Sequence, residues 1–70
     1  MYKDKYSIPT DFANLEIGDK FKWAGNKYMK IREITLKYNE VRINAVNLDE
    51  GESATFYQTS LVYIKGRSHE

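Results

Sequence analysis

The chain has 70 residues, which limits it to one small domain, because a chain of this length buries only about 60% of the surface that its unfolded form exposes. It contains no cysteine, so neither a disulfide framework nor a thiolate zinc site can stabilise the fold, and a reducing compartment is expected. The net charge of +1 does not select between acidic and basic partners.

The basic residues are concentrated in the middle of the chain. Residues 20–42 hold seven basic and two acidic residues, for a net charge of +5, whereas residues 1–19 and 43–70 each carry −2. Apolar residues alternate with these charges, which is typical of a folded segment rather than of a disordered tail. No apolar run approaches the roughly 20 residues that cross a bilayer, and no secretory signal is recognised. We therefore expect an intracellular protein that does not enter a membrane.

The first nine residues alternate weakly between polar and apolar side chains, which fits either an edge strand or an arm. Pro9 ends this segment because its ring removes a backbone donor. A polar residue after it can cap one short helical turn, in which Phe12 and Leu15 face the same way. A turn of this size has little stability of its own and must pack against the rest of the domain.

Gly18-Asp19 precedes a segment with a period of two, in which Phe21 and Trp23 face inward while the neighbouring lysines face outward. The sequence "AGN" at 24–26 tolerates positive φ and predicts a tight hairpin. In the long strand that follows, the apolar positions change parity after Ile31. A bulge or a strong bend in this strand is therefore expected.

Two further turns are predicted at Asn39-Glu40 and at residues 49–52, where Gly51 is expected in the left-handed conformation. The strand between these turns also changes parity, which implies a second bend. Two more short strands complete the domain. Five strands at short spacing indicate a meander that curls into a partly open barrel.

The predicted fold is therefore all-β: a small five-stranded barrel with one short helical turn near the N-terminus. The chain divides into an N-terminal arm or edge strand at residues 1–9, a single β-barrel domain at residues 10–65 and a flexible tail at residues 66–70. The expected core takes apolar residues from every element, namely Phe12, Leu15, Phe21, Trp23, Ile31, Ile34, Ile43, Val46, Leu48, Phe56, Val62 and Ile64.

No residue pattern identifies a reaction, a cofactor or a metal. The single histidine, His69, lies next to the last residue, where nothing holds a catalytic base or a metal ligand in place. The acidic residues around Gly51 lack the spacing of a calcium loop and indicate an acidic turn. Neither a phosphate-binding glycine motif nor a serine elbow is present. We therefore expect a protein that is not an enzyme and that uses no cofactor.

The basic segment 20–42 is the strongest candidate for a function. Exposed tyrosines and arginines are typical of protein-binding surfaces. For such a surface we predict Tyr28, Lys30, Arg32, Tyr38 and Arg42.

Two alternatives remain open for the same segment. Proteins that bind single-stranded nucleic acid stack bases on aromatic rings while lysines contact the phosphates. For this alternative the predicted residues are Lys20, Lys22, Lys27, Lys30 and Arg42. In the second alternative, the lysines bind nothing and only keep a small barrel soluble and protect its edge strands. Either a monomer or an edge-paired dimer fits the alternating pattern.

Three short motifs add an independent indication. They are "FANLEIGDKF" at 12–21, "GNKYMK" at 25–30 and "NAVNLDEG" at 44–51, and they are followed by Phe56 and Val62. This set resembles a pattern in small proteins of tailed bacteriophages, with F-x-x-L-x-x-G-D-x-F, Y-x-K and N-A-V-x-L-x-x-G. The segment at 31–43 makes one hairpin longer than the pattern leads us to expect.

The resemblance implies a small SH3-like β-barrel and an accessory protein that acts in the cytoplasm of the infected host by binding a host or phage protein. It also implies structural roles. Gly18-Asp19 would turn the chain into the first barrel strand, Tyr28 would pack across from Val46, and Asn44 would satisfy backbone groups where its strand bends. It assigns no catalytic residue.

Overall fold

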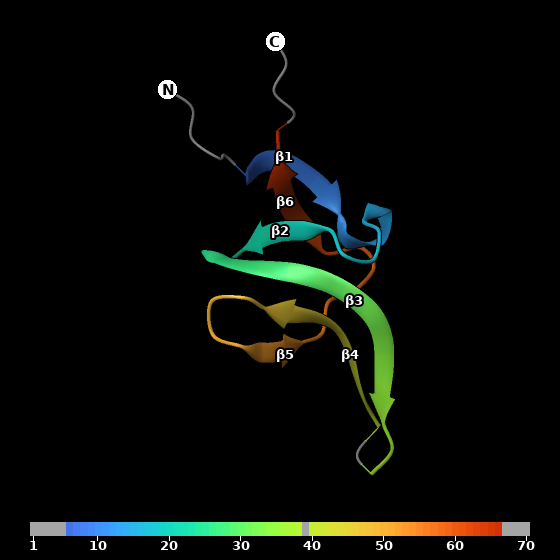
Figure 1. The fold of residues 1–70 in the computed structure, drawn as a ribbon. Coiled ribbons are helices and arrows are strands. Elements are labelled where there is room, and N and C mark those ends of the chain that lie inside the picture. The colour runs from blue at the N-terminus through green and yellow to red at the C-terminus, as the bar shows by residue number, and fades with distance from the viewer. Residues whose placement is uncertain (1–5, 39, 67–70) are drawn as a thin grey trace.

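The computed structural model describes residues 6–38 and 40–66, which form an all-β fold as predicted. The elements are β1 (Tyr6–Asp11), the 3₁₀ helix η1 (Phe12–Asn14), β2 (Lys20–Trp23), β3 (Asn26–Leu36), β4 (Val41–Asn47), β5 (Glu52–Ala54) and β6 (Leu61–Lys65). The strands pair antiparallel in one sheet with the order β1-β6-β2-β3-β4-β5 (Figure 1). The predicted helical turn after the first segment is confirmed as η1.

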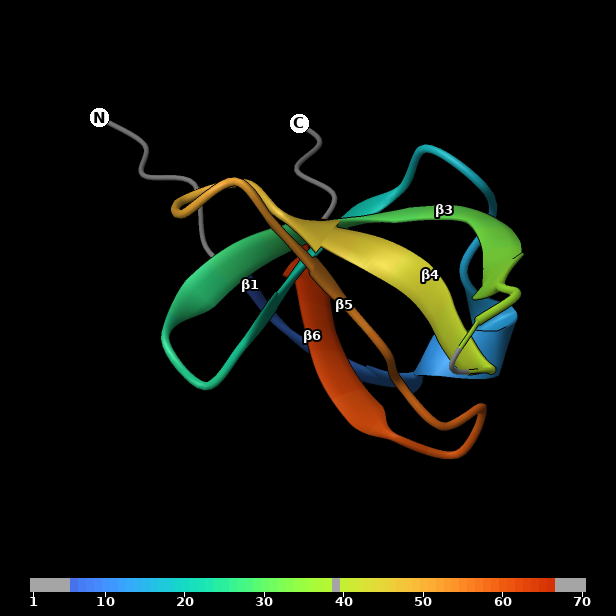
Figure 2. The ribbon, with the colours of Figure 1, turned by 90° about the horizontal axis from the view of Figure 1, so that it is seen from below.

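Among the described residues there are six strands rather than the predicted five, and the sheet is not closed into a barrel. The additional strand is β1, which continues past Pro9 to Asp11 and pairs with β6. Pro9 fits there because β1 is an edge strand with one neighbour, so its missing backbone donor is not needed. The two end strands, β1 and β5, do not pair with each other, and the sheet stays open although it is strongly twisted (Figure 2).

The turn between β2 and β3 is as tight as the sequence predicted. Trp23 pairs with Asn26, so only Ala24 (φ 51°) and Gly25 (φ 85°) form the loop. Positive φ at both central residues gives the turn whose twist matches that of the flanking strands. Glycine adopts this conformation without strain, whereas alanine does not.

Two other expected turns also contain residues of positive φ. Gly51 (φ 74°) lies between β4 and β5 in the predicted left-handed conformation, and Glu40 (φ 56°) lies between β3 and β4. Asn39, the other residue of the second turn, lies outside the described residues. The same holds for residues 1–5 and 67–70, which include most of the predicted tail and His69.

The predicted bend in the long strand is confirmed. Lys30 pairs with Ala45 and Ile34 pairs with Ile43, so residues 31–33 of β3 lie opposite Asn44 alone. This irregularity turns the second half of β3 away from β2. Figure 1 shows β3 and β4 continuing beyond the rest of the sheet as two strands. We call residues 34–36 and 41–43 the ribbon. They belong to the segment that the phage pattern marks as unusually long.

The core is an aromatic cluster centred on Phe56. The centroid of its ring lies between 5.1 and 5.3 Å from the centroids of Phe12, Phe21, Trp23 and Tyr28. Large rings fill the space between few strands, which a short chain requires. Among the described residues, the buried hydrophobic ones are Phe12, Leu15, Phe21, Tyr28, Ala45, Phe56 and Val62.

Several residues predicted for the core lie elsewhere. Trp23 is 45% exposed because it ends β2 beside the hairpin turn, where its indole contacts Tyr28 and Phe56 at the rim of the cluster. Ile34 and Leu48 are also exposed, the first on the ribbon and the second after the end of β4. The remaining aliphatic predictions, Ile31, Ile43, Val46 and Ile64, are half-buried.

These errors have one cause. The period of two correctly separates the two faces of a strand. It does not predict over what length of the strand the inner face is packed against other parts of the chain. An open sheet covers only part of each strand, and the ends at Trp23 and at the ribbon stay in contact with water.

Candidate binding site

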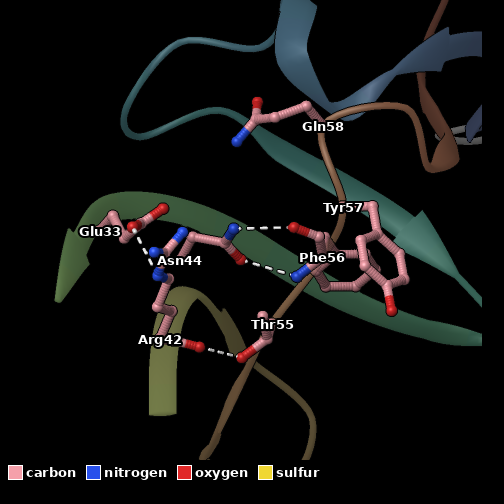
Figure 3. A pocket seen from close by; sticks show the side chains of 7 residues that line it. All are labelled: Glu33, Arg42, Asn44, Thr55, Phe56, Tyr57 and Gln58. Carbon is pink, nitrogen blue, oxygen red and sulfur yellow. Dashed lines mark hydrogen bonds and ion pairs between the residues drawn. The ribbon is translucent and has the colours of Figure 1, made fainter. Parts of the chain in front are cut away.

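A shallow pocket of ≈ 220 Å³ lies where the bend of β3 and β4 faces the connection between β5 and β6. Figure 3 shows the side chains that line it: Glu33, Arg42, Asn44, Thr55, Phe56, Tyr57 and Gln58. We call it the bend pocket. Glu33 and Asn44 belong to the irregular part of the β3–β4 pair, and Arg42 lies close to it on β4.

Asn44 fixes the floor of the bend pocket. Its Nδ2 donates to the carbonyl oxygen of Phe56 at 2.9 Å, and the backbone N–H of Phe56 donates to its Oδ1 at 2.8 Å (Figure 3). Asn44 and Phe56 are both buried, so these two bonds satisfy backbone groups that water cannot reach. The structural role predicted for Asn44 is confirmed, with the connection after β5 as its partner.

Arg42 and Glu33 form one side of the bend pocket. The Nε atom of Arg42 lies 3.9 Å from Oε2 of Glu33, and the two side chains are 69% and 44% exposed. An ion pair that is this long and this exposed contributes little to stability and leaves guanidinium donors available. The backbone of Arg42 is held separately, because its carbonyl oxygen accepts a hydrogen bond from the hydroxyl of Thr55.

Tyr57 lies on the other side of the bend pocket from Glu33 and Arg42 (Figure 3). Its backbone is fixed in a small turn, since its N–H donates to Oγ of Ser60 at 3.2 Å and its carbonyl accepts from the N–H of Ser60 at 3.0 Å. Its side chain is nevertheless 83% exposed. A fixed backbone that carries an exposed aromatic ring is suited to contact another molecule.

The predicted protein-binding residues separate into two groups. Arg42 lines the bend pocket, and Arg32 and Tyr38 are exposed along the same hairpin. Tyr28 is buried against Phe21 and the rest of the aromatic cluster, so the prediction that its ring lies on the surface is wrong. Its register also differs from the expectation, because it pairs with Asn47 rather than with Val46.

Lys30 was predicted for both kinds of surface, and it lies on neither. Its Nζ donates to the carbonyl oxygens of Phe12 at 3.1 Å and Leu15 at 2.7 Å, and it lies 4.6 Å from the centroid of the Phe12 ring. The cause is the strand register, which places Lys30 opposite the buried residue Ala45 and on the core side of β3. Its ammonium group therefore holds η1 against the sheet.

The turn at Gly18-Asp19 confirms the structural role that the phage resemblance implied. The N–H of Gly18 donates to the carbonyl of Lys30, and the N–H of Lys30 donates to the carbonyl of Asp19, at 2.8 and 2.9 Å. The carboxylate of Asp19 also accepts from the N–H of Glu16 at 2.8 Å. These bonds direct the chain into β2 beside β3.

The acidic turn after β4 has a structural role. Oδ1 of Asn47 accepts from the backbone N–H groups of Asp49 and Glu50 at 2.8 and 2.9 Å. Oδ2 of Asp49 accepts from the N–H of Lys27 at 2.9 Å. The carboxylate is thus directed toward the protein backbone. Among the residues that the structure describes, no group of three or more His, Asp or Glu side chains could hold a metal ion.

A second basic group surrounds Tyr6. The Nζ atoms of Lys22, Lys27 and Lys65 lie 5.8, 5.4 and 5.9 Å from the centroid of its ring. Lys22 and Lys27 are directly opposite each other in the β2–β3 pair. We call this set the lysine cluster. It joins two of the lysines predicted for nucleic-acid binding with Lys65, which sequence reasoning missed because pairing of β6 with β1 was not foreseen.

Three residues of the nucleic-acid prediction are not part of the lysine cluster, and one of them is Lys30, which bonds to Phe12 and Leu15. Lys20 is exposed on β2, and Arg42 lines the bend pocket instead. Sequence reasoning named neither Thr55 nor Gln58 as a site residue, and no sequence signal distinguishes them from other polar residues of a connecting loop.

The chain matches no protein-family model, no curated protein and no solved structure. Among the described residues, no helix has the length and apolar character needed to cross a membrane.

Proposed function

We propose that this protein binds a segment of another protein in the bend pocket and that it catalyses no reaction. The observation that carries the proposal is the pairing of two exposed side chains, Arg42 and Tyr57, on either side of a floor that Asn44 holds rigid. Arginine and tyrosine supply much of the energy of protein interfaces. A rigid floor reduces the entropy that is lost when a partner binds.

The chemistry of the bend pocket defines the partner segment. The guanidinium of Arg42 suits a carboxylate, which can accept two parallel hydrogen bonds from it. The rings of Tyr57 and Phe56 suit an apolar or aromatic side chain next to that carboxylate. Arg32 and Tyr38, which are exposed along the same hairpin, would extend the contact beyond the pocket.

The finer fold assignment belongs to this proposal. Strands β2 to β5 form a meander, and β6 returns to pair with β2. We infer that these five strands are an open SH3-like fold to which β1 adds an edge strand. The resemblance to small tailed-phage proteins supports a host or phage protein as the partner and the host cytoplasm as the place of action.

Selection from a random peptide library on the immobilised protein tests the proposal. The variant Arg42→Ala/Tyr57→Ala removes two exposed side chains of the bend pocket, and the control Lys20→Ala/Tyr63→Ala removes one basic side chain and one tyrosine from β2 and β6, outside the pocket. We expect acidic peptides with an apolar neighbour, bound equally by the wild type and the control and at least about tenfold more weakly by the pocket variant. Equal binding to both variants, or no enrichment at all, would contradict the proposal.

The lysine cluster favours nucleic-acid binding as a second candidate function. Lys22 and Lys27 are like charges placed directly opposite each other, and a phosphate between them would relieve their repulsion. A gel shift with random oligonucleotides at low salt measures this binding. Retardation that disappears in Lys22→Ala/Lys27→Ala but persists in Arg42→Ala would establish the lysine cluster as the site. If the wild type causes no retardation, this candidate is removed.

A further inference from the structure

The outer edge of β3 has no partner strand beyond Lys30 among the residues that the structure describes. The first half of β3 pairs with β2 as far as Lys20 and Met29, and the backbone of Lys30 bonds to Gly18 and Asp19. From Ile34 to Leu36, β3 pairs only with β4. A strand edge of this kind can pair with another strand.

The backbone groups of Thr35 face this outer edge. The carbonyl oxygen of Leu36 points to the side of β4, because it accepts a hydrogen bond from the N–H of Glu40 in the β3–β4 turn at 2.8 Å. Successive residues of a strand present their N–H and C=O groups to alternate sides. Thr35 therefore presents both groups to the side away from β4.

One face of the ribbon is aliphatic. Residues that are directly opposite in an antiparallel pair lie on the same face. Ile34 is opposite Ile43, and Leu36 is opposite Val41. Ile34 and Val41 are 50% and 42% exposed, and the buried core cluster contains none of the four. An exposed aliphatic face beside a free edge is characteristic of a surface for strand pairing.

We propose that two copies of this chain associate edge to edge through β3, antiparallel, with Thr35 of each copy opposite Thr35 of the other. In this register Ile34 lies opposite Leu36 of the second copy. Glu33 lies opposite Lys37 of the second copy, the residue that follows β3. The symmetry repeats both contacts, so the edge is complementary to itself in apolar character and in charge.

The charges select this register over its neighbours. A pairing centred on Glu33 places the Glu33 carboxylates of the two copies opposite each other. A pairing centred on Lys37 places the two Lys37 ammonium groups opposite each other. Pairings centred on Ile34 or on Leu36 place Thr35 opposite Glu33 or Lys37 and form no ion pair. Opposite charges directly across two strands are stabilising, and like charges are destabilising. The register centred on Thr35 therefore has the favourable charge pattern.

A charge-exchange series tests the proposal. Sedimentation equilibrium of the wild type up to about 1 mM should show a reversible monomer–dimer equilibrium. Lys37→Glu and Glu33→Lys should each weaken dimerisation at least about fivefold, because each single reversal creates two like-charge pairs, whereas the double variant should recover most of the affinity. Lys20→Glu, which gives the same net charge as Lys37→Glu, should leave dimerisation unchanged. A wild type that is monomeric at the highest concentration, or a double variant as weak as the single ones, would overturn the proposal.

Thr35→Pro tests the backbone pairing directly. Proline removes the N–H of residue 35, which the dimer needs. This N–H does not bond to β4, so the monomer should keep its fold. We expect loss of the dimer with a cooperative thermal transition retained. Neither Thr35 nor Lys37 lines the bend pocket, so Thr35→Pro and Lys37→Glu report on self-association independently of peptide binding, whereas Glu33→Lys also changes the pocket. If Thr35→Pro remains folded and dimerises like the wild type, the pairing does not occur at this edge.

Discussion

Replacing Asn44 with alanine should destabilise the domain more than any comparable change in a polar side chain. Asn44 is 5% exposed and makes hydrogen bonds to both backbone polar groups of Phe56, the residue at the centre of the aromatic cluster. Alanine leaves the N–H and the C=O of Phe56 buried without partners. It also releases the segment that forms the floor of the bend pocket.

The size of the effect follows from this burial. A buried backbone group that loses its only partner costs about 1 to 3 kcal/mol, so two such groups give roughly 2 to 4 kcal/mol if some water enters. A domain of this size has about 3 to 5 kcal/mol of total stability. The variant Asn44→Ala should therefore lose most of its stability at 25 °C.

Asn47→Ala is the matched control. Asn47 is equally buried and also takes part in two hydrogen bonds, but its partners are N–H groups of the turn after β4. Water can replace it there, so we expect a loss of only about 1 kcal/mol. Urea unfolding followed by Trp23 fluorescence measures both variants. A loss below about 0.5 kcal/mol for Asn44→Ala, or one no larger than that for Asn47→Ala, would refute the reasoning.

Three other changes follow from the same contacts. Lys30→Met should lower the free energy of unfolding by about 1.5 to 3 kcal/mol, because the carbonyls of Phe12 and Leu15 lose a charged donor. Lys20→Met, at an exposed position, is the control, and equal unfolding curves for the two variants would contradict this prediction. Ala24→Gly should raise the free energy of unfolding by up to about 1 kcal/mol, since alanine is strained at φ 51°, and an unchanged midpoint would show that the turn is not strained. Iodide should quench Trp23 less than free tryptophan but more than a buried indole, and either extreme would contradict its place at the rim of the core.

Local patterns predicted those features that depend on neighbouring residues. The inward position of Phe21, the positive φ of Gly25 and Gly51 and the irregularity in β3 each depend on backbone geometry over a few residues, and each is found in the structure. The resemblance to phage proteins added the structural roles of Asn44 and Gly18, which the hydrogen bonds confirm.

Features that depend on distant pairing were not predictable. The pairing of β1 with β6 determines the sixth strand and brings Lys65 to Tyr6, yet nothing in either segment specifies the other. The register of β3 turns Tyr28 and Lys30 inward, although their amphipathic side chains suit a surface equally well. Of the predicted protein-binding residues, only Arg42 lies in the bend pocket, because the bend brings it to the loop that contains Tyr57.

Amide chemical shifts of the ¹⁵N-labelled protein, recorded while the tightest selected peptide is added, test the proposed function most directly. Binding in the bend pocket predicts that the largest changes occur at Glu33, Arg42, Asn44 and residues 55–58. They should be absent in Arg42→Ala/Tyr57→Ala. Changes concentrated at Tyr6, Lys22 and Lys27, with the bend pocket unaffected, would contradict the account and make the lysine cluster the binding site.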